Sequence, residues 1–393
     1  MNETALEARL AALRGAAPPR PLDARALAAL AANPGCRRRA VLDAAGVDKG
    51  ALAQRLGRPA PFGQSPFAIT RGLAFERRVK AGGGAELVAL LRARLGPSAG
   101  AEDAPVRSPD LLARDGGPAV RVARTRQALA EAEPGAWTVL DHPLLRLVVA
   151  GSPVHLEPDL VVLRPDGRWT VVEIKSFPIL NGSADPAKVG AAARQAAVYL
   201  LALRETAAEL AGVALPESPY AEPDGPAGAP DHRALLICPK DFTNQPTAAL
   251  LDLRKPLAVS RRQLSRLTRV EELLAALPPG PAFDLSESPE GEPVRSDAQL
   301  SASVGGLPAA YAPDCLSGCE LAFHCRAEAR ERGAVEVLGR GVRGELGSLG
   351  SVPEALCAAR GPVAAPDPAT AEAAARLARA AALRAEALNG GAG

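Results

Sequence analysis

Two acidic residues and a lysine near the middle of the chain have the types and spacing needed for metal-dependent hydrolysis. Asp159 precedes one run of apolar β-forming residues, and Glu173 and Lys175 close the next run, after the turn sequence Pro165-Asp166-Gly167. Proline fixes φ and glycine accepts a left-handed conformation, so this turn predicts a three-residue β-hairpin. Carboxylates are ligands that Mg²⁺ and Mn²⁺ prefer, and a nearby ammonium can orient water and offset charge on a phosphate.

The register of this hairpin decides whether the three groups meet. If Arg164 pairs with Arg168, Asp159 lies opposite Glu173 and projects from the same face. Lys175 shares that face because side chains alternate along a strand. A two-residue turn would instead send the first carboxylate to the other face, and a plain surface salt bridge is the alternative role for the lysine. Lys is rare in this chain and Arg is common, so a surface salt bridge would be expected to use Arg. A lysine at position 175 therefore favours a chemical role for its compact, desolvatable amine.

Pro158-Asp159 followed by Glu173-Ile174-Lys175 resembles the signature of the PD-(D/E)XK nucleases. Downstream, Gln195 and Tyr199 match the Q-x3-Y motif of the RecB-like branch of these enzymes. They lie on a predicted helix with Asp185 as its N-cap, and a spacing of four puts both on one face.

The resemblance implies an α/β fold with a restriction-endonuclease-like core, in which helices flank a mixed central sheet. It also implies that Asp159, Glu173 and the Ile174 carbonyl hold Mg²⁺ or Mn²⁺. Lys175 would then orient or activate the attacking water, and Gln195 and Tyr199 would complete the catalytic set.

RecB-like nucleases also carry an upstream helix whose His or Glu completes the metal site. Residues 70–76, TRGLAFE, resemble this element and imply Glu76 as a further ligand, although Phe75 stands where the His is expected. The alternative is a surface Glu76 paired with a basic neighbour such as Arg77 or Lys80.

Three of the six cysteines form a close group, Cys315, Cys319 and Cys325, and Cys36 lies far upstream. We see no secretory apolar region ahead of them and expect a cytoplasmic protein, in which clustered Cys indicate metal rather than disulfides. One cysteine upstream and three near the C-terminus resemble the iron–sulfur RecB-like nucleases, including those of CRISPR adaptation. That resemblance implies a [4Fe–4S] cluster held by these four residues.

A zinc ion is the alternative occupant of the cysteine-rich segment. Its ligands would be Cys315, Cys319, His324 and Cys325, with mixed sulfur and nitrogen ligation. His324 and Cys325 are adjacent, however, and neighbouring residues rarely aim at one ion. Either group would have a structural role, as a cross-link that closes a loop of nearly the whole chain.

The chain has 393 residues, enough for one large domain with additions or for two domains. We expect a helical N-terminal region over 1–69, a nuclease core over 70–277, a linker over 278–299, a Cys-rich segment over 300–345, and a C-terminal helical element with a frayed tail over 346–393. Expected helices cover 2–15, 22–32, 70–96, 122–132 and 260–277. Expected strands cover 144–149, 234–238 and 248–253, and a Pro-rich insertion covers 215–232.

The formal net charge is only +2, so there is no global basic footprint of the kind that many nucleic-acid-binding proteins have. Arg37, Arg38, Arg39 and Arg77 follow proposed site residues and are the expected phosphate contacts. The apolar runs are too short to cross a bilayer, so we expect no membrane association. The chain also lacks a G-x4-GK[ST] phosphate loop, so we expect no helicase activity of its own.

The expected function is a metal-dependent DNA nuclease in repair or defence, acting on single strands or DNA ends. A separate helicase, defence or repair protein is a plausible partner. The alternatives are an inactive DNA-binding or scaffold protein of the same fold, and a nuclease that acts on RNA.

Overall fold

The structure is a computed structural model that describes most of the chain. The described ranges are 3–60, 66–96, 104–111, 116–149, 152–213, 229–241, 243–265, 267, 269–275, 277, 282–361 and 366–390. Most of the predicted insertion at 215–232 and the end of the predicted tail therefore lie outside the described residues.

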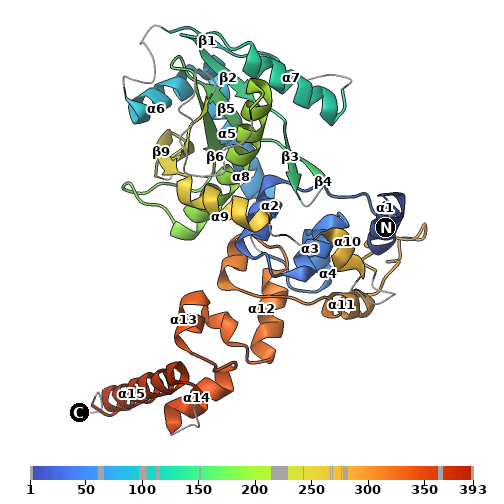
Figure 1. The fold of residues 1–393 in the computed structure, drawn as a ribbon, viewed down its shortest axis with the longest axis vertical. Helices are drawn as coiled ribbons and strands as arrows, with labels where there is room; N and C mark the ends of the chain where they lie inside the picture. The colour runs from blue at the N-terminus through green and yellow to red at the C-terminus, as the bar shows by residue number, and fades with distance from the viewer. Residues whose placement is uncertain are drawn as a thin grey trace.

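A mixed sheet of seven strands forms the centre of the described fold (Figure 1). Its order is β1-β2-β5-β6-β8-β9, and β7 also pairs with β6. β5 and β6 are antiparallel, β6 and β8 are parallel, and β8 and β9 are antiparallel. The strands are β1 (Val106–Arg107), β2 (Trp137–Asp141), β5 (Leu160–Leu163), β6 (Arg168–Ile174), β7 (Ala229–Pro230), β8 (Arg233–Pro239) and β9 (Pro246–Asp252). The expected α/β class with a mixed central sheet is confirmed.

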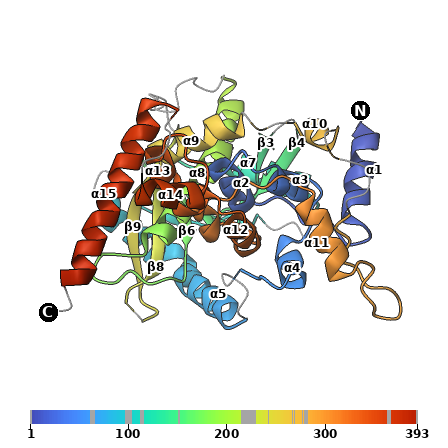
Figure 2. The ribbon, with the colours of Figure 1, turned by 90° about the horizontal axis from the view of Figure 1, so that it is seen from below.

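Helices cover both faces of this sheet, as the alternation of buried side chains on β5 and β6 requires. Val161 and Val171 pack with α2 (Ala24–Ala32), α8 (Pro186–Ala211) and α9 (Arg254–Leu264). Val162 and Val172 pack on the other face with α5 (Pro66–Lys80) and α6 (Ala85–Leu95). Figure 2 shows α5 and α9 on opposite sides of the sheet.

A second core joins the N-terminal helices to the cysteine-rich segment, although more than 200 residues of chain separate them. Leu42 and Leu52 are fully buried there together with Leu300 and Leu321. The elements of this core are α1 (Glu3–Arg14), α3 (Arg37–Ala44), α4 (Lys49–Arg55), α10 (Val270–Ala275), α11 (Asp297–Gly305), the 3-10 helix η3 (Pro313–Ser317) and α12 (Ala322–Glu331).

The C-terminal helices form a small cluster of their own, which lies away from the sheet (Figure 1). It contains the 3-10 helix η4 (Val335–Leu338), α13 (Arg340–Glu345), α14 (Val352–Arg360) and α15 (Pro368–Gly390). α15 packs Ala374 and Leu377 against the buried Leu346 and Ala358, so the predicted tail begins as a packed helix, while its residues 382–389 are exposed.

Several elements differ from their predicted bounds for tertiary reasons. The single helix expected over 260–277 is two helices, because α9 buries Leu257 in the sheet-side core and α10 buries Leu274 in the second core. Phe283, in the segment expected to be a linker, is fully buried in that second core. The strand expected over 144–149 is β3 (Leu145–Val149), which pairs with β4 (Ser152–Leu156) in a separate two-stranded sheet. α7 (Pro118–Ala130) lies where a helix was expected over 122–132.

Candidate active site and cysteine cluster

The hairpin between β5 and β6 has the register that brings the two carboxylates together. The Arg164 N–H donates to the Arg168 carbonyl at 2.8 Å, and Gly167 adopts a φ of 81° in the three-residue turn. Leu160 therefore pairs with Val172, which places Asp159 opposite Glu173 at the open end. Asp159 Oδ2 also accepts a hydrogen bond of 2.7 Å from the Ile174 N–H.

Both carboxylates project from the sheet face that α2 and α8 cover. Asp159 and Glu173 are in step with Val161 and Val171, which pack with those helices. Glu173 is fully buried, and Lys175 Nζ lies 2.6 Å from its Oε2 as the counter-charge. Glu173 Oε1 is buried without a hydrogen-bond partner among the described residues.

Burial raises the pKa of Glu173 from 4.5 to about 7, and the charge of Asp159 also raises it, while Lys175 lowers it. For Lys175 burial acts to lower the pKa, but Glu173 and Asp159 outweigh it and the pKa is raised. A buried glutamate with no partner for one oxygen, beside a second carboxylate, is the arrangement that a bound cation stabilises.

These pKa directions predict a pH dependence of stability in protein stripped of divalent cations. The folded chain holds the Glu173 proton more tightly than the unfolded chain does. The contribution of this proton to the free energy of unfolding is therefore fully present below about pH 4.5 and is lost as the pH rises through 7. Chemical denaturation with EDTA should show wild type losing about 2 kcal/mol more than Glu173→Gln between about pH 5 and pH 8. If the free energy of unfolding depended on pH in the same way for both proteins, the burial of an ionisable Glu173 would be contradicted. Adding Mg²⁺ should reduce the loss of stability of the wild-type protein.

The predicted Gln195 and Tyr199 lie on α8 and face the hairpin. Asp185 caps this helix through a 2.9 Å hydrogen bond from the Ala187 N–H, as its sequence predicts. Gln195 Nε2 donates to Tyr199 Oη at 3.1 Å, and Tyr199 Oη donates to the Glu157 carbonyl at 3.0 Å. Tyr199 thereby fixes the backbone two residues before Asp159. Burial and the charge of Glu173 raise the pKa of Tyr199, so it remains a neutral donor.

Glu76 does not join Asp159 and Glu173 in the structure. It lies on α5, whose Phe75 and Val79 pack on the opposite sheet face. Among the described residues, no three His, Cys, Asp or Glu side chains meet closely enough to hold one metal ion. The metal role implied for Glu76 therefore finds no support in this geometry.

An ion-pair network holds Glu76 instead. Its Oε1 lies 2.6 Å from Lys80 Nζ and 3.1 Å from His142 Nε2. The hydrogen bond with His142, and then Lys80, lower the pKa of Glu76 to about 2. His142, whose N–H donates to the Asp159 carbonyl at 3.3 Å, was not predicted from the sequence. The signal that could have found it is Asp141-His142-Pro143 at the end of a strand.

The four predicted cysteines come together from opposite ends of the chain. Cys36, Cys319 and Cys325 are buried in or beside the second core, and Cys315 is partly buried there. Burial raises the pKa of Cys319 to about 11, and that of Cys325 to about 12. Cys36, Cys315 and Cys319 line one cavity, and Cys319 and Cys325 lie in the same core.

Side chains from the N-terminal region donate to two of these sulfur atoms. Asn33 Nδ2 lies 3.3 Å from Cys315 Sγ, and Arg38 Nη1 lies 3.2 Å from Cys325 Sγ. Arg38 also pairs with Glu328 at 2.6 Å. His324, the nitrogen ligand of the zinc alternative, has its Nε2 3.3 Å from Glu328 Oε1.

Arg38 and Arg39 correct an expectation from the sequence. They are only 2% and 3% exposed, so they are not surface contacts for nucleic acid. Arg39 pairs with Asp43 at 2.9 Å and donates to the Gly318 carbonyl at 3.0 Å. Both arginines therefore connect the N-terminal helices to the cysteine-rich segment, whereas Arg37 and Arg77 are exposed.

A cavity of about 820 Å³ connects the hairpin to the cysteine-rich segment. Lys175 and Gln195 line one side, and Cys315 and Cys319 line the other. Arg194 joins the two sides, since its Nη2 lies 3.3 Å from Ser317 Oγ. The remaining basic side chains in the lining are Arg25, Arg39 and Lys188. The lining also contains Asp185 and Asp314, so basic side chains outnumber acidic ones and favour an anionic ligand.

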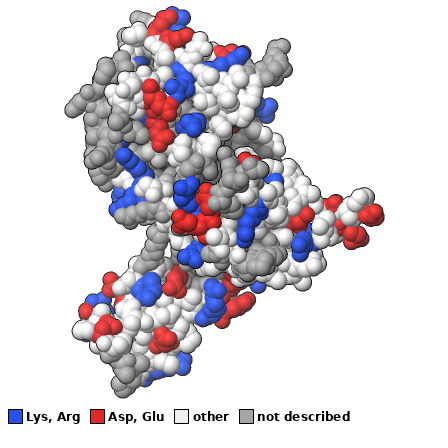
Figure 3. All heavy atoms as spheres, turned by 45° about the vertical axis from the view of Figure 1, so that its right-hand side comes forward, with Lys and Arg blue, Asp and Glu red and all other residues white. Residues whose placement is uncertain are grey.

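Acidic and basic side chains are interspersed on the face that Figure 3 shows, in keeping with the net charge of +2. Within the part of the chain that the structure describes, no helix combines the length and apolarity that crossing a bilayer requires. No protein-family model, curated protein or solved structure matches the chain.

Proposed function

We propose that this chain is a metal-dependent nuclease of the RecB-like PD-(D/E)XK type, which hydrolyses phosphodiester bonds in single-stranded DNA or at DNA ends. One observation carries the proposal. The hairpin register puts Asp159 opposite Glu173, and Lys175 contacts Glu173 while lining the basic cavity. A role in DNA repair or defence, with a separate helicase or other partner, follows from the sequence resemblance.

Asp159, Glu173 and the Ile174 carbonyl are the groups that would hold Mg²⁺ or Mn²⁺. The buried, unpartnered Oε1 of Glu173 supports this assignment, as does the chemistry of two carboxylates on one face. Two carboxylates suit Mg²⁺, which keeps several waters and takes further oxygens from a substrate phosphate. The bound ion would polarise the phosphate and lower the pKa of a water.

The side chains of this chain supply the remaining functions. The Lys175 ammonium, at the cavity wall, can donate to the attacking water or to a phosphate oxygen as negative charge develops there. Tyr199 and Gln195 act as positioning residues, since their hydrogen bonds fix the Glu157 backbone that leads into Asp159. Lys188 and Arg194 line the cavity where neighbouring phosphates of a strand would pass.

We also infer that Cys36, Cys315, Cys319 and Cys325 hold a [4Fe–4S] cluster. The convergence of buried thiols from both ends of the chain, with N–H donors to two sulfur atoms, supports this inference. The zinc alternative requires His324, whose Nε2 lies beside Glu328.

The test is digestion of end-labelled DNA with and without Mn²⁺, by wild type and by Asp159→Asn. We expect Mn²⁺-dependent cleavage by wild type and a loss of roughly 100-fold or more in the variant, because one of the two carboxylates is removed. Asp166→Asn, in the turn at the other end of the same hairpin, is the matched control and should keep full activity. Equal rates for the two variants would exclude the proposed site.

The two other functions give different results in the same assay. A scaffold protein of this fold would bind labelled DNA without cleaving it in Mg²⁺ or Mn²⁺. An RNA nuclease would cleave a single-stranded RNA of the same sequence faster than the DNA.

A further inference from the structure

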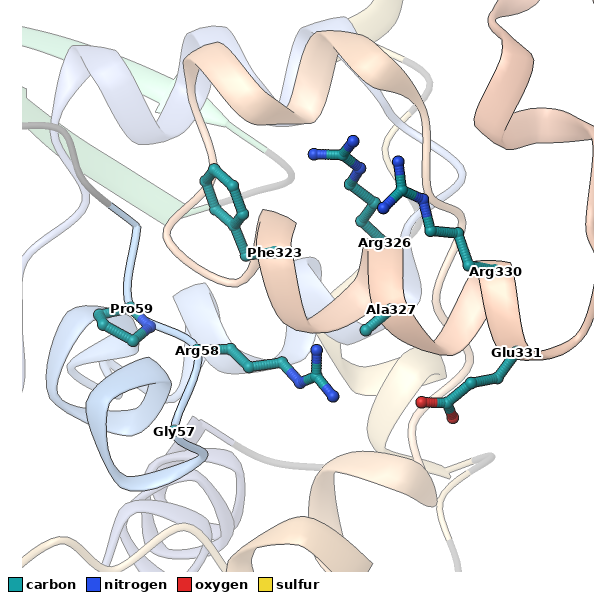
Figure 4. A pocket seen from close by; sticks show the side chains of 8 residues that line it. All are labelled: Gly57, Arg58, Pro59, Phe323, Arg326, Ala327, Arg330 and Glu331. Atoms are coloured by element: carbon teal, nitrogen blue, oxygen red, sulfur yellow. The ribbon is translucent and has the colours of Figure 1, made fainter.

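A second basic pocket lies between the chain that follows α4 and the helix α12, away from the candidate active site. It has a volume of about 510 Å³ and shares no lining residue with the larger cavity. Figure 4 shows Arg58 on one side and Phe323, Arg326 and Arg330 on the other. More than 260 residues of chain separate the two sides, so only the tertiary fold creates the pocket.

The three arginines in this pocket form no ion pair with any residue that the structure describes. Among the described residues, no acidic group or hydrogen-bond acceptor contacts the guanidinium of Arg58, Arg326 or Arg330, and the one acid in the lining, Glu331, forms no ion pair with them. Nearby arginines are paired, as Arg55 of α4 is with Asp297 at 2.6 Å.

Arg326 and Arg330 are also four residues apart on one helix, where like charges repel. A bound anion would relieve the repulsion between these two guanidinium groups.

The shape and chemistry of the pocket indicate what kind of anion fits. Guanidinium groups present planar forks that match phosphate oxygens. Phe323 is partly exposed at the edge of the pocket, and an aromatic ring beside arginines is a stacking platform for a base. We propose that this pocket binds a single nucleic-acid strand, its phosphates on the three arginines and a base on Phe323. The choice of nucleic acid over other polyanions rests on the proposed nuclease function.

The position of the pocket suggests how it would serve the enzyme. Cys319 lines the larger cavity, and α12, which begins three residues later, carries Cys325 together with Arg326 and Arg330 of the pocket. The cysteine-rich segment therefore forms a wall of both sites. A strand held in the pocket would be anchored at a fixed distance from Lys175, outside the region where hydrolysis takes place.

Binding is measured separately from cleavage, using the full-length protein with Lys175→Ala and a fluorescein-labelled oligo-dT. Changing Arg58, Arg326 and Arg330 together to Gln should weaken binding by roughly tenfold or more, and make the slope of log affinity against log salt shallower by about 2. Phe323→Ala should weaken binding by roughly tenfold with no change in slope. Circular dichroism and the absorbance of any bound cluster verify folding.

The matched control changes three exposed arginines elsewhere, Arg94, Arg379 and Arg384, to Gln and so removes the same charge. If the two triple variants bind oligo-dT equally, or if the parent does not bind it, the pocket proposal fails. If the pocket variant loses binding of a labelled polyglutamate peptide and keeps that of oligo-dT, the site is a peptide site and the proposal is also wrong. A wild-type protein that binds through the pocket and cleaves nothing would refute the nuclease function alone.

Discussion

Lys175→Ala is expected to lower Mn²⁺-dependent cleavage of single-stranded DNA by roughly 1,000-fold, since losing a positioned donor near developing charge typically costs 100- to 1,000-fold and proton-transfer assistance adds to this. The ammonium is the closest described cation to Glu173, at 2.6 Å, and it lines the cavity where a phosphate would enter. Single-turnover rates at saturating protein measure this loss directly.

The variant should remain folded despite losing a buried counter-charge. Burial already raises the pKa of Glu173 to about 7, and removing the ammonium raises it further, so the carboxyl group takes up a proton at neutral pH. Binding of oligo-dT should change little because Lys188 and Arg194 still line the cavity.

Two further variants sharpen this test. Lys175→Arg keeps the positive charge but is expected to restore little activity, since a guanidinium fork replaces a compact amine. Lys255→Ala removes an exposed lysine that does not line the cavity and should leave the single-turnover rate nearly unchanged. If Lys175→Ala cleaved single-stranded DNA at the wild-type single-turnover rate, the assignment of the catalytic lysine would be wrong.

Cys319→Ala is expected to have the largest effect on stability. A group bound by thiols from both ends of the chain closes a loop of nearly 300 residues, and a covalent cross-link of that length stabilises by about 5 kcal/mol. Losing one ligand should therefore remove the brown colour of anaerobically purified protein and leave most of it insoluble. Burial raises the pKa of the remaining Cys325 thiol to about 12, so without a metal it stays protonated.

Three matched variants separate the loss of a ligand from the loss of a buried side chain. Cys357→Ala removes an exposed cysteine outside the cluster and should change nothing. Cys36→Ala should abolish the colour only if the group is an iron–sulfur cluster, because the zinc site does not use Cys36. His324→Ala should release metal only if the group is zinc. Colourless wild type that carries stoichiometric zinc would overturn the cluster assignment.

Local sequence was sufficient for the elements whose geometry short-range contacts decide. Pro165 and Gly167 specify the three-residue turn, and the turn sets the register that places Asp159 opposite Glu173. Asp185 and Pro186 likewise predict where α8 begins, and a spacing of four aligns Gln195 with Tyr199. These are contacts between near neighbours in the chain, so the residue types alone define them.

The tertiary structure alone decided which charged groups are buried, which face a helix covers and what lies beside the site. Arg38 reads as a surface charge in a basic run, yet it is buried because Glu328 and Cys325 arrive from nearly 300 residues away. Glu76 ends the segment TRGLAFE, which matches the upstream motif of the RecB-like nucleases. Its helix, α5, nevertheless packs Phe75 and Val79 on the sheet face opposite the carboxylates. The pocket of Arg58, Arg326 and Arg330 likewise exists only because distant parts of the chain pack together. Each depends on contacts between residues distant in sequence, which no local pattern encodes.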